Sequence, residues 1–199
     1  MLTFAAAVFF LIVTPGPGVL STAGVGSGYG FRAGFRYVTG LFIGTNLVAL
    51  AVITGVAAIV LSVPVVRTVL MAASVAYLCY LAFRIATAGS RIAFIEKATA
   101  PGIGAGILLQ TINPKAYAVN TTLFAGFPYA PNSYGFEIVT KLIITNAIWI
   151  PLHLAWLFAG ATLHRLDLSE RAQRRINYAM AASMLAVVAL ALISGASAR

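Results

Sequence analysis

Two short proline-containing segments interrupt apolar runs of this chain, about a hundred residues apart. The first is TPGPG at 14–18, within the run 2–23, and the second is NPK at 113–115, within the run 103–125. Proline removes a backbone donor and clashes with the preceding turn, so a helix must stop, kink or restart there. In a membrane, such a break survives only where protein or a water-filled cavity satisfies the freed polar groups. Two interrupted spans at matching positions in two halves indicate the binding site of a transporter.

Each break is expected to restart a helix. Asn113 suits an N-cap and Pro114 suits the first helical position, where a missing donor costs nothing. Thr14 and Pro15 fit the same two roles in the first half. The free N–H groups and positive dipole end of such a helix bind carboxylates, phosphates and other anions. The alternative is a pair of proline kinks that only shape the helix bundle.

Lys115 is the only basic residue that the pattern places deep within a span, about 12 residues after Ile103. A lysine at this depth is costly and is a functional-site hypothesis by default. It could hold a substrate carboxylate, or release a proton when desolvated. Alternatively, its side chain snorkels along the helix to the membrane interface.

Further polar residues lie in the middle of predicted spans. Asn46 and Asn146 are expected to face the bundle interior or a cavity, and the alternative is ordinary interhelical hydrogen bonding. His153 lies seven residues after Asn146, so both share one helix face. It could relay protons near neutral pH, or it could be an ordinary packing residue. Gln110 and Asn120 belong to the same class, with a weaker expectation.

These residues make up the candidate site. The proton-coupling candidates are Lys115 and His153. The predicted substrate-binding residues are Thr14, Pro15, Gly16, Pro17, Gly18, Asn46, Asn113, Pro114, Lys115 and Asn146.

The acidic residues exclude several other functions. Glu96, Glu137, Asp167 and Glu170 fall in predicted loops or at span ends, which argues against a carboxylate metal site in the core. The sequence contains no nucleophile–base constellation and no phosphate loop. We therefore expect no enzyme activity, no metal and no cofactor. Glu137 and Lys141, four residues apart, are interpreted as an ordinary surface ion pair.

Composition indicates a polytopic membrane protein. Hydrophobic residues make up 61% of the chain and charged residues 9%, against about 45–50% and about 25% in soluble domains. The 199 residues leave room for about six spans of roughly 20 residues and no soluble domain. The net charge of +9 lies mainly in short connections, where it determines orientation and does not indicate nucleic-acid binding.

Nine of the thirteen basic residues lie in connections after the first, third and fifth spans. The positive-inside bias therefore predicts that both termini lie outside the cytoplasm. The predicted spans are at about 2–24, 38–61, 65–86, 103–126, 138–160 and 177–195.

The two halves of the chain resemble each other. Pro15 and Pro114 are 99 residues apart, and the dipeptide Thr-Asn occurs only at 45–46 and 145–146, 100 residues apart. Because each repeat contains an odd number of spans, three, the second copy must cross the membrane in the opposite orientation. The predicted fold is an all-α integral membrane domain, 1–199, with six transmembrane helices in two inverted three-helix repeats, about 1–90 and 100–199. Spans 1 and 4 are broken by proline.

Several segments resemble the LysE/RhtB family of amino-acid exporters. TPGPGVL followed by GYGFRAGFRYVTG looks like the family's first signature, and LLQTINPKAYAVNTTLF closely resembles its NPKA signature. AYLCYLAFRIA is similar to its third span, and the resemblance covers nearly the whole chain. It implies a small exporter that moves amino acids or related metabolites outward across a bacterial inner membrane by exchange with protons.

One departure from the family concerns proton coupling. Family members often carry an aspartate after a glycine in the second span, where this chain has Gly44-Thr45-Asn46. Because an amide cannot titrate, coupling in this chain would need Lys115 or His153.

The sequence therefore predicts a secondary transporter that alternates access between its two halves and holds a substrate carboxylate at the two breaks. The rival predictions are a passive channel and a non-transporting membrane scaffold. Expected partners are a small-molecule substrate and membrane lipids, with no nucleic acid, and a homodimer is left open.

Overall fold

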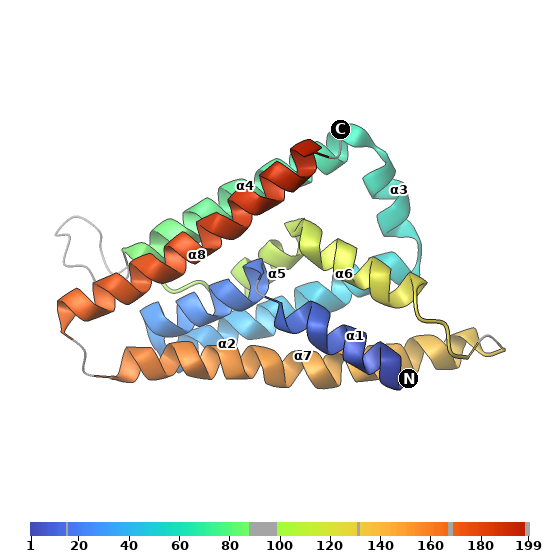
Figure 1. Ribbon diagram of the computed structural model, residues 1–199, viewed down its shortest axis with the longest axis horizontal. Helices are drawn as coiled ribbons and strands as arrows, with labels where there is room; N and C mark the ends of the chain where they lie inside the picture. The colour runs from blue at the N-terminus through green and yellow to red at the C-terminus, as the bar shows by residue number, and fades with distance from the viewer. Residues whose placement is uncertain (15, 88–98, 131, 167–168, 198–199) are drawn as a thin grey trace.

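The computed structural model describes residues 1–14, 16–87, 99–130, 132–166 and 169–197, and helices dominate these ranges (Figure 1). The predicted all-α class is confirmed, since the described residues contain no strand. The helices, in chain order, are α1 Leu2–Val13, α2 Pro17–Ile53, α3 Val56–Ser62, α4 Pro64–Ala86, α5 Ile103–Ile112, α6 Pro114–Ala125, α7 Tyr134–Arg165 and α8 Glu170–Ser197.

Three of the described helices are long and apolar enough to cross a membrane, judged by length and composition. They are α2, α4 and residues 134–163 of α7, while α1 and α5 are shorter apolar helices. Large apolar side chains also cover the outside of the bundle, with Phe10 66% exposed, Ile143 61% exposed and Phe158 63% exposed. Helices that are apolar on their outer faces as well as their inner faces are typical of a membrane environment.

The long helix α2 folds back on itself at Gly30. This glycine has φ 80° and ψ 176°, a backbone conformation that residues with a side chain rarely adopt. The Tyr37 hydroxyl donates a hydrogen bond of 3.0 Å to Ser21 Oγ, although sixteen residues of straight helix would separate them by about 24 Å. Residues 17–29 and 31–53 therefore form a helical hairpin, which separates the first two predicted spans.

The second predicted span is not one continuous helix. The apolar run 38–61 ends its first helix at Ile53, and a separate short helix, α3, follows. The break lies at Gly55, which has φ 77° and supplies the left-handed conformation before α3. The prediction of an unbroken span is therefore wrong, because the pattern of apolar residues contains no signal of this turn except the glycine itself.

Glycines allow the central helices to approach one another closely. A Cβ atom on Gly40 would lie 2.0 Å from the Ile103 carbonyl oxygen, and one on Gly106 would lie 2.4 Å from the Tyr37 carbonyl oxygen. α2 and α5 are thus in backbone contact at these two positions, as is common where small residues line a helix interface. α2 also packs along α7, while α4 and α8 run side by side on the opposite face (Figure 1).

Candidate substrate cavity

The second break lies between α5 and α6 and has the predicted geometry. Asn113 is the N-cap of α6, and its Oδ1 accepts a hydrogen bond of 3.1 Å from the Lys115 backbone N–H. Pro114 occupies the first helical position. The Asn113 Nδ2 group donates to Gln110 Oε1 at 3.1 Å, so the last turn of α5 and the first turn of α6 share one amide network.

The first break differs from its predicted capping arrangement. Thr14 ends α1, and its hydroxyl donates to the Phe10 carbonyl at 2.6 Å. Gly16 is the N-cap of α2, and Pro17 is its first residue. The assignment of Thr14 as N-cap and Pro15 as first helical residue is therefore wrong, because the second proline of TPGP occupies that position. Pro15 itself lies outside the described residues.

The two breaks meet through Lys115. Its ammonium donates a hydrogen bond of 2.7 Å to the carbonyl oxygen of Thr14, which lies 101 residues earlier in the chain. The side chain also runs over Gly16, where an added Cβ would lie 2.8 Å from Lys115 Cδ and 2.9 Å from Nζ. The lysine therefore reaches from the start of α6 to the first break, and it does not extend along its own helix toward an end.

A cavity of about 60 Å³ lies where the breaks meet, which is room for several water molecules. Lys115 is the one charged residue among its described lining residues. The lining residues are Leu11, Ile12, Thr14, Gly16, Gly18, Val19, Thr45, Gln110, Asn113, Lys115, Ala116, Val119, Asn120, Leu123, Thr145, Trp149 and His153.

Asn46 and Asn146 bond to each other. Asn46 Nδ2 donates to Asn146 Oδ1 at 3.1 Å, and Asn146 Nδ2 donates to Asn46 Oδ1 at 2.9 Å. Neither asparagine lines the cavity, whereas the preceding threonines, Thr45 and Thr145, both do. The asparagines thus join α2 to α7, and their neighbours contribute the polar groups of the cavity wall.

His153 forms one wall of the cavity together with Trp149. The imidazole stacks on the indole with ring centroids 3.6 Å apart and planes 13° apart. Its Nδ1 lies 3.0 Å from the Trp149 carbonyl oxygen. Since a carbonyl can only accept, Nδ1 carries the hydrogen, and Nε2 of the neutral ring is an acceptor. A Cβ on Gly18 would lie 3.5 Å from that Nε2, so the ring also faces the start of α2.

A more deeply buried lysine, Lys141, lies at the end of the bundle where α1 begins. Lys141 is 1% exposed and forms an ion pair of 2.8 Å with Glu137. The interpretation of this pair as an ordinary surface pair is therefore wrong, because Lys141 is buried although it lies near the start of α7. The carbonyl oxygens of Phe124 and Gly126 accept hydrogen bonds from its ammonium, which lowers the cost of burying the charge.

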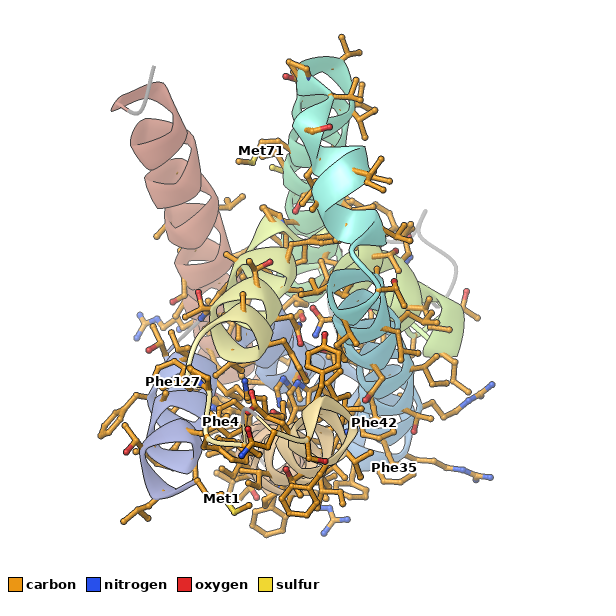
Figure 2. The ribbon with its side chains drawn as sticks, turned by 90° about the vertical axis from the view of Figure 1, so that its right-hand side faces the viewer. Met1, Phe4, Phe35, Phe42, Met71 and Phe127 are labelled. Atoms are coloured by element: carbon orange, nitrogen blue, oxygen red, sulfur yellow. The ribbon has the colours of Figure 1, made fainter. Side chains whose placement is uncertain are left out.

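The Glu137 carboxylate binds the loop that follows α6. One of its oxygens accepts hydrogen bonds from the backbone N–H groups of Tyr129 and Ala130, at 3.0 Å and 2.8 Å. Phe4 of α1 packs edge to face on Phe127, with centroids 6.3 Å apart (Figure 2). We call Phe4, Phe127, Tyr129, Glu137 and Lys141 the loop clamp. In the sequence, this cluster is marked by two oppositely charged residues four positions apart, Glu137 and Lys141, which follow a loop that contains aromatic residues.

The predicted binding residues thus fall into separate groups. Thr14, Gly16, Gly18, Asn113 and Lys115 line the cavity, while Pro17 and Pro114 begin the helices beside it. Sequence reasoning missed Thr45, Thr145 and Trp149 as lining residues, although the repeated Thr-Asn dipeptide marked the two threonines. No cluster of three or more potential metal ligands occurs among the described residues.

Comparison with known proteins relates this architecture to transport. Part of the chain is 27% identical to the leucine efflux protein of Enterobacter sp. (strain 638) over 134 residues, which covers 63% of this chain and 62% of that protein. The chain thus matches less than two thirds of that relative's length. No solved structure matches the chain. Residues 9–196 match the LysE type translocators. Because this match covers nearly the whole of an apolar, helical chain, the protein is a multi-pass membrane protein that belongs to the LysE type translocator family.

Proposed function

We propose that this protein is a secondary transporter that exports amino acids or related small metabolites and binds the substrate carboxylate at Lys115. The observation that carries the proposal is the Lys115 ammonium, which joins two helix breaks beside a cavity. The leucine efflux protein among its relatives supports the same class of substrate.

The chemistry of the breaks favours a carboxylate. The present partner of the ammonium is a neutral carbonyl, the oxygen of Thr14. A carboxylate adds the attraction between opposite charges to the hydrogen bond, so it is a better partner for the ammonium than this neutral carbonyl. α2 and α6 also begin at the cavity and direct the positive ends of their dipoles toward it. A bound anion would therefore be stabilised by Lys115 and by two helix N-termini together.

Alternating access would follow from two inverted halves, each of three spans. The matching positions of the breaks and the Asn46–Asn146 pair support this arrangement, because a two-fold axis in the membrane plane places equivalent residues of α2 and α7 together. The relationship to the LysE type translocators favours a bacterial inner membrane. The charge bias favours an orientation with both termini outside the cytoplasm. A cysteine at Arg171, with Cys79 replaced, should then be protected from an impermeant thiol reagent in intact cells. Labelling from outside would reverse this orientation.

Proton exchange would use Lys115 or His153, the two titratable side chains that line the cavity. A proton gradient should then accelerate export in the wild type, and His153→Gln should remove that acceleration if the histidine carries the proton. Gradient-independent export by the wild type would contradict proton coupling.

Efflux of labelled amino acids from loaded proteoliposomes tests the proposal directly. We expect saturable efflux that is accelerated by unlabelled substrate on the opposite side. The reason is that the binding site of a carrier must return to the first side of the membrane after each transport event. Non-saturable flux without counterflow would indicate a passive channel. Absence of flux for every amino acid in liposomes with correctly folded protein would overturn the proposed function and favour a membrane scaffold.

A further inference from the structure

The described lining of the cavity includes one positively charged side chain but no carboxylate. Lys115 supplies the positive charge, and the remaining lining residues are neutral under ordinary conditions. An α-amino acid brings an ammonium group as well as a carboxylate. In a site shielded from water, that ammonium needs hydrogen-bond acceptors, because an unpaired buried charge is costly. The neutral acceptors of the cavity therefore determine which ligands can bind.

Several of these acceptors already have a donor. Gln110 Oε1 accepts from Asn113, and Asn113 Oδ1 accepts from the backbone of Lys115. The Thr14 carbonyl accepts the Lys115 ammonium. Two side-chain oxygens of the cavity wall can still accept a hydrogen bond, one on α6 and one on α7.

Thr145 provides the first of these oxygens. Its Oγ1 is shielded from solvent and has no hydrogen-bond partner among the described residues. Other threonines of α7 behave differently, since Thr140 and Thr162 each donate to the carbonyl four residues earlier, both at 2.8 Å. A buried hydroxyl without a partner is rare because it retains the full cost of desolvation. A polar ligand in the cavity would remove that cost.

Asn120 provides the second. The side chain is 4% exposed, and its Nδ2 donates to the Ala116 carbonyl at 2.8 Å. That bond identifies the nitrogen end of the amide, so Oδ1 is the end that remains available to a donor. Asn120 follows Lys115 on α6, and both line the same cavity. The helix that supplies the cation for a carboxylate thus also supplies an acceptor for an ammonium.

We propose that Asn120 Oδ1 and Thr145 Oγ1 form an ammonium subsite that makes the cavity selective for zwitterionic α-amino acids with an uncharged side chain. This inference rests on the proposed function. The apolar wall formed by Leu11, Ile12 and Val119 receives the aliphatic part of the substrate. A dibasic amino acid is disfavoured, because its second ammonium would have no carboxylate partner and would be repelled by Lys115.

A carboxylic acid without an amino group is also disfavoured. It could pair with Lys115, but it would leave the Thr145 hydroxyl without a partner and would not use the Asn120 oxygen. A site built to hydrogen-bond a substrate N–H group strongly rejects the analogue that lacks it, because the buried polar groups of the site are then unpaired. The subsite therefore predicts that an α-amino acid binds more tightly than the corresponding carboxylic acid without an amino group. It does not predict the absolute affinity of either.

The test compares three probes, leucine, 4-methylpentanoate and lysine, by ligand-induced thermal stabilisation of the purified protein and by counterflow in proteoliposomes. Thr145→Val should weaken leucine binding about tenfold, as expected for a lost hydrogen bond to a charged group. The same variant should leave 4-methylpentanoate unchanged or improve it. Thr145→Ser should retain the wild-type preference. Thr162→Val is the matched control, since it removes a hydroxyl of the same helix outside the cavity.

A second variant tests the subsite by gain of function. Asn120→Asp places a carboxylate at the proposed acceptor position and should raise the affinity for lysine relative to leucine several-fold. If wild-type protein binds leucine and Thr145→Val keeps the wild-type ratio of leucine to 4-methylpentanoate, the subsite is wrong while the transport proposal stands. An unchanged lysine preference in Asn120→Asp likewise argues against the subsite. If wild-type protein binds none of the three probes, the subsite is overturned, and the proposed function is then decided by efflux of the other amino acids.

Discussion

Lys115 and Lys141 lie in the same apolar bundle but have very different surroundings. Lys141 is 1% exposed and binds the Glu137 carboxylate at 2.8 Å and the Gly126 carbonyl at 2.9 Å. Its ammonium also lies 5.6 Å from the centre of the Phe4 ring, within range of a cation–π interaction. The Lys115 ammonium has a single hydrogen-bond partner among the described residues, the carbonyl of Thr14, and it lies beside a cavity.

The difference separates a structural charge from one available to a ligand. A buried ammonium that has a counter-ion and several acceptors has nothing to gain from a further anion. An ammonium with one neutral partner still lacks much of the stabilisation that it lost on leaving water. Lys115 therefore gains from a carboxylate ligand, whereas Lys141 holds α1, α7 and the loop after α6 together.

The largest effect is expected when Lys141 is removed. Lys141→Met leaves the Glu137 carboxylate without its counter-ion and frees the carbonyls of Phe124 and Gly126. Breaking one partner of a buried pair is strongly destabilising, so the apparent Tm should fall by about 10 °C. Thermal unfolding of the purified variant in detergent measures this. A Tm within about 2 °C of the wild type would show that the loop clamp does not stabilise the fold.

The second effect concerns ligand affinity at Lys115. Lys115→Met should weaken leucine binding roughly ten- to a hundredfold, since a hydrogen bond to a charged group is lost. Its Tm should stay close to that of the wild type, because one hydrogen bond to a carbonyl is lost. Lys115→Arg should restore little binding, because a planar guanidinium does not reproduce the point charge of an ammonium. Wild-type efflux by Lys115→Met, at equal membrane abundance, would remove this lysine from the site.

The third effect concerns the amide pair that connects the two halves. A double-mutant cycle on Asn46→Ala and Asn146→Ala should give a coupling energy of about 0.6 kcal/mol, and at most about 1.7 kcal/mol, as for other polar pairs within membranes. Chemical unfolding of the four proteins in detergent measures it. Strictly additive single effects would mean that the reciprocal hydrogen bonds contribute nothing to stability.

The same comparison shows which features the sequence could predict. Both breaks, the Asn113 cap and the position of Pro114 follow from local rules, because proline and N-cap preferences act over a few residues. The hundred-residue offset between Asn46 and Asn146 marked two residues that the fold brings into contact. Such features depend on the order of residues and on a repeated pattern, both of which are visible in the chain.

Other features depend on long-range packing and could not be predicted. Whether Thr14 or Gly16 caps α2 depends on which of two prolines begins the helix. The burial of Lys141 requires the loop after α6 to fold over it, and a sequence pattern cannot show this. The inward position of Thr145 depends on the rotation of α7 against α2.

The smallest effect is expected from a methyl group at Gly16, and it refines the comparison between the lysines. Its Cβ would lie 2.8 Å from Lys115 Cδ and 2.9 Å from Nζ, so the lysine must move away from the Thr14 carbonyl. The displaced atoms are the far end of a flexible side chain, and φ −159° is an extended conformation that alanine adopts freely. Gly16→Ala should therefore keep the wild-type Tm. The affinity for leucine should fall about fivefold, or roughly 1 kcal/mol, because the ammonium no longer lies at the start of α2.

Gly104→Ala, which has open space around its added Cβ, is the control and should bind leucine as the wild type does. A loss of stability without a change in affinity would mean that Lys115 is fixed as firmly as Lys141. The proposal that Lys115 binds the substrate carboxylate would then be wrong.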